Sequence, residues 1–336
     1  SMTVLVQDEW GNLVDDQTVT VIPSLLLTSD NSAVNGSAKT GTVVSNGTAA
    51  FASLNWTAVG NYKILYSFDN LSGSQSATSS SFAITAATPA QLAWSANVPS
   101  TVASRTTFSS APVLIVQDTY GNRVTTDNST SATLTLTNSV ANKANNNATV
   151  GRTKTAVGGM ITFSTLAPAG KATTGYTLTA TSSGLTGPGD SSSFAITAGA
   201  ASSLQLNPTT ISARAGVALG SNISLTLWDA DGNTVDADSA PAAATVASPL
   251  TMTGLTGNAT QADITMNNGT AVFNSGTFGI AGTAGTQKIT YQVTYGGTTF
   301  YADQTVTLSA GLPAKIAIST QPANVIARTE IGRAHV

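Results

Sequence analysis

The chain has 336 residues, of which 41% are hydrophobic and 9% charged, with no cysteine and a formal net charge of −3. The absence of cysteine excludes a disulfide framework, and the weak negative charge argues against nucleic acid and anionic membrane as partners. Since a typical globular domain is about one-quarter charged, the surface must be polar through Ser, Thr, Asn and Gly. Thr and Val are plentiful, which favours strands. No apolar run is long enough for a transmembrane helix.

One motif recurs three times and divides the chain into similar copies. It reads Gln7-Asp8-Glu9-Trp10-Gly11-Asn12 near the start, Gln117-Asp118-Thr119-Tyr120-Gly121-Asn122 in the middle, and Trp228-Asp229-Ala230-Asp231-Gly232-Asn233 later. A recurrence at intervals of about 110 residues marks tandem copies of one unit.

The motif itself predicts a strand, a tight turn and a second strand. Apolar residues alternate before each turn, as in Val4 and Val6 or Leu114 and Val116, which is the pattern of a strand with one buried face. Gly and Asn tolerate the positive φ that tight turns require, so we expect Gly11, Gly121 and Gly232 in that conformation. The aspartate before each Gly can accept hydrogen bonds from nearby backbone N–H groups.

Later segments of each copy predict further short strands and a buried core. The core residues expected between the sheets are aromatic: Phe51, Phe163, Phe273, Tyr62 and Tyr176. Each copy offers about seven short strands between Gly, Asn, Ser and Pro turns. The predicted fold class is therefore all-β, with tandem antiparallel immunoglobulin-like β-sandwich domains.

The recurring segments also predict the domain boundaries. Each copy begins with a short apolar run that contains Leu92, Leu204 or Ile316. We expect sandwich domains at 1–86 (truncated at its N-terminal side), 87–198 and 199–309, with the start of a fourth at 310–330. The joints contain small residues and Pro but no long Gly/Ser linker, so neighbouring domains are expected to stack end to end with limited bending.

The last six residues, 331–336, are excluded from this reasoning. Ile331-Gly332-Arg333-Ala334-His335-Val336 is the translation of a common sequencing adapter in one frame, and it contains the only His of the chain. We set these residues aside, as an engineered scar would be set aside. We expect the sequence to be a fragment of a longer open reading frame.

Three motifs together resemble a known family. These are Val-x-Asp-x-x-Gly-Asn-x-Val, Gly-x-Ala-x-Phe and Gly-x-Tyr-x-Leu-x-Ala, and they are similar to the bacterial Ig-like repeats of the invasin and intimin type, across nearly the whole chain. The resemblance implies a stalk in a large bacterial surface adhesin, located extracellularly or at the cell surface. Its expected partners are the neighbouring Ig-like domains, and a host protein or glycan bound by parts outside this sequence.

One acidic cluster suggests a metal site. Asp229, Asp231, Asn233 and Asp236 lie close together in the third motif, and calcium favours several oxygen ligands on one loop. The spacing does not match an EF-hand, and the first two copies place Trp10 and Tyr120 where the third has Asp231. A solvated turn is the preferred interpretation, and calcium is the only cofactor that the sequence suggests.

Two further recurrences have competing interpretations. Trp10 and Tyr120 occupy the same turn position, where an exposed ring could stack on a sugar; a ring folded over the neighbouring strand end is the preferred alternative. Arg105, Arg214 and Arg328 recur near the start of each copy. Their repetition indicates a structural salt bridge or a joint contact more than ligand binding.

The sequence favours a structural role over catalysis. The usual nucleophile–base pairs need Cys or His, and no catalytic motif is present. The leading hypothesis is a non-catalytic stalk segment of a large bacterial surface or secreted protein. The alternatives are an array of glycan- or protein-binding modules, and accessory domains of an extracellular enzyme.

Overall fold

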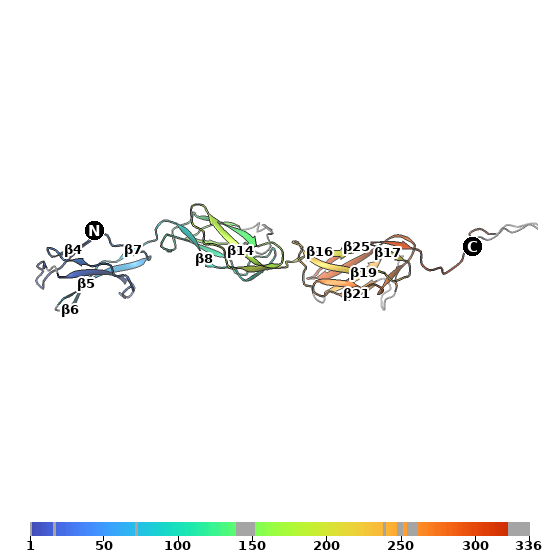
Figure 1. Cartoon of the computed structure of the whole chain (residues 1–336), viewed down its shortest axis with the longest axis horizontal. Coiled ribbons are helices and arrows are strands. Elements are labelled where there is room, and N and C mark those ends of the chain that lie inside the picture. Colours follow the sequence, from blue (N-terminus) through green and yellow to red (C-terminus); the bar gives the residue numbers. More distant parts are fainter. Residues whose placement is uncertain are drawn as a thin grey trace, which may run out of the picture. The chain divides into compact units, whose positions relative to one another are not determined.

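The computed structural model describes residues 2–15, 18–70, 73–138, 152–237, 240–246, 251–253 and 261–321. These residues form strands and loops without any helix (Figure 1), which confirms the predicted all-β class. No helix in this part of the chain is therefore a candidate to cross a membrane. The chain divides into two compact units, Ser1–Thr197 and Ala198–Val336, which are described separately.

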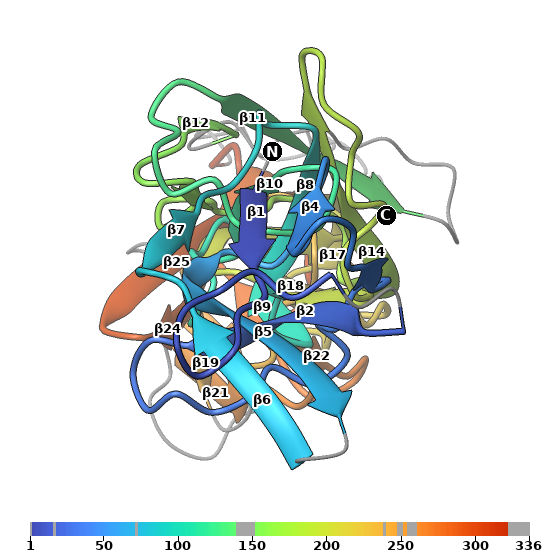
Figure 2. The ribbon, with the colours of Figure 1, turned by 90° about the vertical axis from the view of Figure 1, so that its left-hand side faces the viewer.

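The first unit begins with a sandwich of two sheets. One sheet pairs β1 with β4, and the other has the order β3-β2-β5-β6, with β7 also paired to β5. In Figure 2 this sandwich faces the viewer, with β1, β4, β5 and β6 labelled. The strands are β1 (Met2–Leu5), β2 (Thr20–Leu27), β3 (Thr42–Val43), β4 (Thr48–Phe51), β5 (Gly60–Asn70), β6 (Gly73–Thr78) and β7 (Phe82–Ile84).

The second sandwich completes the first unit. Its sheets have the orders β13-β10-β8 and β12-β11-β14-β15-β9. Most pairs are antiparallel, but β9 runs parallel to β15, the closing strand. The strands are β8 (Gln91–Ala96), β9 (Thr101–Ala103), β10 (Val113–Gln117), β11 (Ser131–Asn138), β12 (Thr153–Thr155), β13 (Met160–Thr162), β14 (Thr173–Ser182) and β15 (Phe194–Thr197).

The second unit contains the third sandwich, which repeats this plan. Its sheets have the orders β16-β18-β22 and β17-β25-β24-β19-β21, beside a small sheet of β20 and β23. The second strand, β17, again runs parallel to the closing strand, β25. The strands are β16 (Ala201–Asn207), β17 (Thr210–Arg214), β18 (Ile223–Asp229), β19 (Pro241–Val246), β20 (Thr251–Thr253), β21 (Gln261–Thr265), β22 (Thr270–Phe273), β23 (Gly279–Ala281), β24 (Gly285–Tyr295) and β25 (Thr298–Ser309).

Each sandwich encloses its own hydrophobic core. The predicted core aromatics are buried, with exposed fractions of 5% or less: Phe51, Phe163, Phe273, Tyr62 and Tyr176. This confirms the predicted register, because a shift by one residue would turn these rings to solvent. Two sheets packed over such a core, with successive strands changing sheet, form the immunoglobulin-like sandwich that the sequence predicts.

The recurring Gly-Asn turn connects the two sheets of each sandwich. In the first sandwich, β1 before the turn pairs with β4, whereas β2 after it pairs with β3 and β5. A single bridge closes each turn, such as that between Gln117 and Arg123. The motif is thus a strand-turn-strand corner, as predicted. Its two strands lie in different sheets, so the Gly-Asn pair does not join two strands of one hairpin.

Candidate functional site

The aspartate of each turn holds the turn closed by the same hydrogen bonds. In the second sandwich, Oδ1 of Asp118 accepts from the backbone N–H groups of Tyr120 and Asn122, each at 2.9 Å. Its Oδ2 accepts from Nδ2 of Asn122 at 2.9 Å. Asp8 and Asp229 accept the equivalent three bonds in the other copies.

The glycine of each turn has the positive φ that the sequence predicts. The φ values are +88° at Gly11, +86° at Gly121 and +69° at Gly232. A Cβ atom at Gly11 or Gly121 would meet nothing within 4 Å. The constraint at these two positions is therefore the backbone conformation and not lack of space.

A fourth hydrogen bond ties the start of the copy to its turn. Oδ2 of Asp118 accepts from the backbone N–H of Ala87 at 3.0 Å, and Oδ2 of Asp229 accepts from that of Gly199 at 2.8 Å. Sequence reasoning missed this bond, because it joins residues about 30 positions apart and its donor is a backbone group that any residue type supplies. The signal in the sequence was the similar separation between the joint and the turn aspartate, which is 31 residues in one copy and 30 in the next.

These bonds also favour the ionised form of the aspartates. Burial by itself would raise the pKa of Asp118, but hydrogen bonds from the Asn122 side chain and from backbone N–H groups lower it from 3.8 to about 2. Burial opposes the lowering at Asp229 as well, where the N–H groups of Asn233 and Gly199 again reduce the pKa. The ionised carboxylate is therefore the form that accepts the hydrogen bonds of the corner.

The residues of the predicted calcium site are only partly brought together. Asp229 is 4% exposed, and its two oxygens accept four hydrogen bonds from the turn and the joint. Asp236 is exposed, and its backbone oxygen accepts from the Tyr295 hydroxyl. The described residues contain no group of three or more His, Cys, Asp or Glu that could hold a metal ion. The calcium site stays a prediction.

The preferred interpretation of Trp10 and Tyr120 was wrong. We expected each ring to fold over a neighbouring strand end, but Trp10 is 78% exposed and Tyr120 is 63% exposed. Each aromatic residue lies two positions after the turn aspartate. Its backbone N–H points inward and donates to the aspartate carboxylate. The side chain therefore projects away from the turn and stays largely exposed.

Tyr120 lines a cavity that both sandwiches of the first unit contribute to. The cavity has a volume of about 440 Å³, and its wall includes Lys39, Asn55 and Trp56 of the first sandwich. The Lys39 ammonium lies 5.8 Å from the centre of the Trp56 ring. Such a wall of aromatic and polar groups can bind a small polar ligand by stacking and hydrogen bonding.

Asn122 connects the same two sandwiches. Its Nδ2 donates to the backbone oxygen of Thr57 at 2.6 Å, and its Oδ1 accepts from the N–H of Val59 at 3.3 Å. Asn122 thus serves the turn and the joint together, which the sequence did not predict.

The recurring arginines differ in their structural settings. Arg214 donates to the backbone oxygens of Ala310 and Gly311, which confirms a contact at the joint. Arg105 has a φ of +62°, and its N–H donates to the oxygen of Pro168. Arg328 lies outside the described residues.

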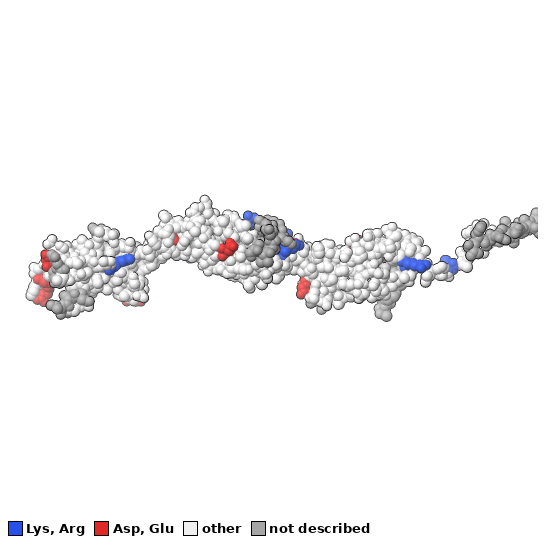
Figure 3. Space-filling view, viewed as in Figure 1, with Lys and Arg blue, Asp and Glu red and all other residues white. Residues whose placement is uncertain are grey.

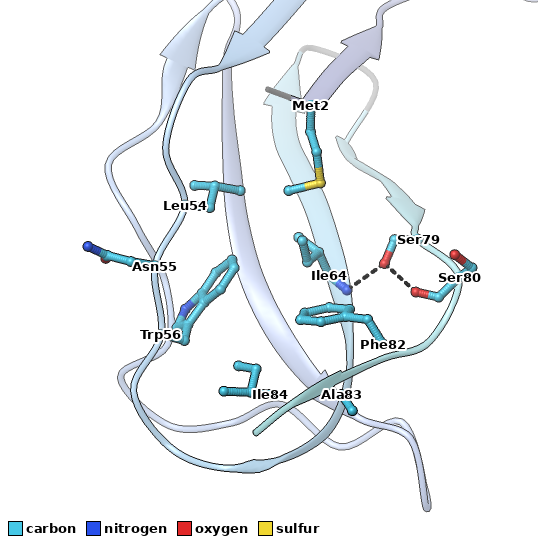
Figure 4. A pocket seen from close by; sticks show the side chains of 10 residues that line it. All are labelled: Met2, Leu54, Asn55, Trp56, Ile64, Ser79, Ser80, Phe82, Ala83 and Ile84. Carbon is cyan, nitrogen blue, oxygen red and sulfur yellow. Dashed lines mark hydrogen bonds between the residues drawn. The ribbon is translucent and has the colours of Figure 1, made fainter. Parts of the chain in front are cut away.

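A second cavity opens in the first sandwich, beside β7. It has a volume of about 610 Å³ and is mostly apolar, with the side chains of Leu54, Trp56 and Phe82 around it (Figure 4). Ser79 at its rim accepts from the N–H of Ile64 and donates to the oxygen of Ser80. Nothing in this lining is equipped for acid–base chemistry, so the cavity is suited to binding apolar side chains.

The chain matches no protein-family model and no curated protein. Among solved structures, it is similar to FdeC, an adhesin of Escherichia coli, with 16% identity over 90% of this chain and 89% of that chain and a TM-score of 0.37. It also matches the EC1–3 segment of Drosophila N-cadherin (11% identity, 91% and 92% covered, TM-score 0.23). The FN1–FN3 domains of chicken CNTN1 match at 11% identity, with 85% and 90% covered and a TM-score of 0.26.

Proposed function

We propose that the chain is a non-catalytic structural segment of a large extracellular or surface-anchored bacterial protein. In this proposal, tandem sandwiches of the invasin and intimin type project a distal binding part away from the cell. The observation that carries it is the repeated hydrogen bond from the first backbone N–H groups of a copy to its turn aspartate, Ala87 to Asp118 and Gly199 to Asp229.

In this proposal, the bond limits how freely the joint bends. The closing strand β15 ends at Thr197, and the bonded N–H of Gly199 follows two residues later. Chain that is fixed at both ends over so few residues has little room to bend, since reach and flexibility grow with the number of free residues. A load-transmitting segment needs this property, whereas a flexible tether does not.

The surface is consistent with a passive spacer. In the face that Figure 3 shows, most visible side chains are neither acidic nor basic, with a few isolated charges. A salt bridge joins Lys288 and Asp303 at 3.1 Å, and both side chains are more than half exposed. Such a surface stays soluble through neutral polar groups and supplies no concentrated charge for recognition.

Small-angle scattering on the monomeric chain tests this function. We expect a maximum dimension of about three sandwich lengths, because the proposed joints hold successive copies end to end. A maximum dimension close to that of one compact globule would contradict the proposal.

A binding array is the second candidate, and it is favoured by the exposed rings of Trp10 and Tyr120. The cavity that contains Tyr120 and Trp56 offers an aromatic wall beside the Lys39 ammonium and the Asn55 amide, which suits a glycan. Glycan-array binding that Tyr120→Ala abolishes and Val157→Ala preserves would support this candidate. Val157 is a suitable control because it is 76% exposed in the second sandwich.

A further inference from the structure

The closing strand of the third sandwich is much longer than that of the second. β25 has twelve residues, Thr298–Ser309, whereas β15 has four, Phe194–Thr197. In the second sandwich, the chain between β14 and β15 crosses to the other sheet, where Thr186 bridges to Gln91 of β8. In the third, the chain stays in one sheet, and β25 pairs with β24 along nearly its whole length.

Only the second half of β25 has a neighbour on its other edge. β17 pairs with residues 305–309 of β25, and just before it the oxygen of Thr209 accepts from the N–H of Thr305. Among the residues that the structure describes, none pairs with residues 298–304 on that side. We call residues 298–304 the open window. The hairpin turn limits it at one end and β17 limits it at the other.

The open window presents the backbone groups of three residues. The N–H of Thr305 points to the β17 side, and β25 keeps a single register with β24. Successive residues of a strand direct their backbone groups to opposite sides. Thr299, Tyr301 and Asp303 therefore direct their N–H and C=O groups to the open edge. Such an edge is a template for an added strand.

The open window is symmetric about Tyr301, since three of its residues precede Tyr301 and three follow. An antiparallel copy of the window therefore pairs with it in full when the two Tyr301 residues lie opposite each other. Thr299 then faces Asp303, which brings a hydroxyl to a carboxylate. Phe300 faces Ala302, so a large side chain meets a small one, and both are only partly buried in one copy. Complementary cross-strand pairs of this kind stabilise a sheet.

The charge of Asp303 and the length of the window favour this register. The Asp303 carboxylate lies on the outer face, where its Oδ1 accepts from Thr290 at 2.8 Å and its Oδ2 lies 3.1 Å from Lys288 Nζ. A register that places the two Asp303 residues opposite each other is unfavourable, because like charges repel across a strand pair. Every shift also shortens the pairing, because the hairpin turn or β17 then lies beside part of the window.

We propose that the open window of β25 binds the same window of a second copy of this chain, with Tyr301 of each copy at the two-fold axis. Each of the three facing pairs exchanges two backbone hydrogen bonds, and strand addition of this kind is a common mode of recognition. Because both copies use the same surface, the contact is isologous and closes at two copies. It joins two segments side by side and does not rest on the stalk function.

Sedimentation equilibrium of the full chain over a concentration series tests this proposal. We expect a mass of two copies that falls to one on dilution and never exceeds two. Tyr301→Pro should stay monomeric, because Pro lacks the N–H that faces the second copy. Its melting temperature should stay close to that of wild type at dilution, since this N–H donates no bond to β24 and an edge strand tolerates Pro there. Tyr301→Thr is the matched control, which keeps the N–H and should still dimerise.

Substitutions of Thr299 test the register. Thr299→Lys places an ammonium opposite Asp303 of the second copy, twice in each dimer, and should lower the dissociation constant about tenfold. Thr299→Asp places like charges there and should raise the dissociation constant by a similar factor. Both effects should shrink at high salt, because these pairs lie on the exposed face. Equal affinity of the two variants would contradict this register.

A single introduced cysteine locates the axis, because the chain has none of its own. Facing Cα atoms of a hydrogen-bonded antiparallel pair are about 5.5 Å apart, which suits a disulfide. Tyr301→Cys should therefore form a covalent dimer on mild oxidation. Thr307→Cys is the matched control: it is exposed on the same face, but it lies where β17 covers the edge, and it should not cross-link.

Three results would overturn the proposal: a wild-type mass of one copy at all concentrations, a mass above two copies, or equal dimerisation by Tyr301→Pro and wild type. Faster cross-linking at position 307 than at position 301 would do so as well. The Tyr301→Pro chain is also the monomer on which scattering should be measured. The stalk function and the dimer are thus tested separately, and either can fail without the other.

Discussion

The backbone N–H of Ala87 donates a 3.0 Å hydrogen bond to Oδ2 of Asp118, 31 residues further along the chain. This bond fixes where the chain enters the second sandwich, and it uses a carboxylate whose other acceptor positions hold the turn. One side chain thus couples a local turn to the joint between copies. Gly199 and Asp229 repeat the relationship in the second unit.

The pH dependence of this coupling follows from the lowered pKa of Asp118, about 2 in the folded chain against an ordinary value of 3.8. Because the folded-state pKa is the lower one, the ionised carboxylate stabilises the fold above about pH 4, and this contribution is lost as the pH falls through about 2. Titration of the Asp118 carboxyl carbon by NMR measures the pKa directly. A midpoint at or above 3.8 would contradict the hydrogen bonds described here.

The turn glycine gives a second prediction. Gly121→Val should destabilise the second sandwich by about 1–3 kcal/mol, because a β-branched residue is strained at a φ of +86°. Gly121→Asn is the matched control and should cost less, since Asn tolerates this conformation. Denaturant unfolding of both variants measures the difference. Equal stability of the Val variant and wild type would show that the turn relaxes to another conformation.

The core of the second sandwich gives a third prediction. Phe163 is 1% exposed, so Phe163→Ala should reduce the free energy of unfolding by about 3–5 kcal/mol through lost burial and the cavity left behind. Val157→Ala nearby removes an exposed side chain and should change stability little. Calorimetric melts of the two variants provide the comparison, and similar transitions would mean that Phe163 is not packed as described.

Much of the fold was predictable because it rests on local patterns. Period-two alternation before Asp118 predicted a half-buried strand, and the Gly-Asn pair predicted the positive φ at Gly121. The burial of Phe163 followed from the same alternation. What could not be predicted depends on which strands meet in space: the change of sheet at the corner and the bond from Ala87. The exposure of Tyr120 was missed because an aromatic residue next to a turn packs inward or outward according to surroundings that one sequence does not define.

Calcium gives a fourth prediction, for the cluster of Asp229, Asp231, Asn233 and Asp236. The Asp229 carboxylate already accepts four hydrogen bonds, and a cation would have to displace some of them. We therefore expect the melting temperature of the third sandwich to be the same in calcium and in a chelator. A rise with calcium that Asp231→Asn and Asp236→Asn remove would instead establish the metal site.

The last prediction concerns the joint between the first two sandwiches. Asn122 donates to the oxygen of Thr57 and accepts from the N–H of Val59, in addition to its bond with Asp118. Asn122→Ala removes both bonds across the joint, so the first sandwich should sample a wider range of orientations against the second. Asn12→Ala is the matched control, because Asn12 bonds to Asp8 in the same way within the first turn.

The chain contains no cysteine, so two introduced cysteines can carry spin labels at known places. Ser76 and Thr155 are exposed and lie on strands of the first and second sandwich. We expect a broader distance distribution between these labels in Asn122→Ala than in wild type or Asn12→Ala. If all three distributions had the same width, the short length of the joint and the bond from Ala87 to Asp118 would be sufficient to limit bending, and the contacts of Asn122 would add nothing to stiffness.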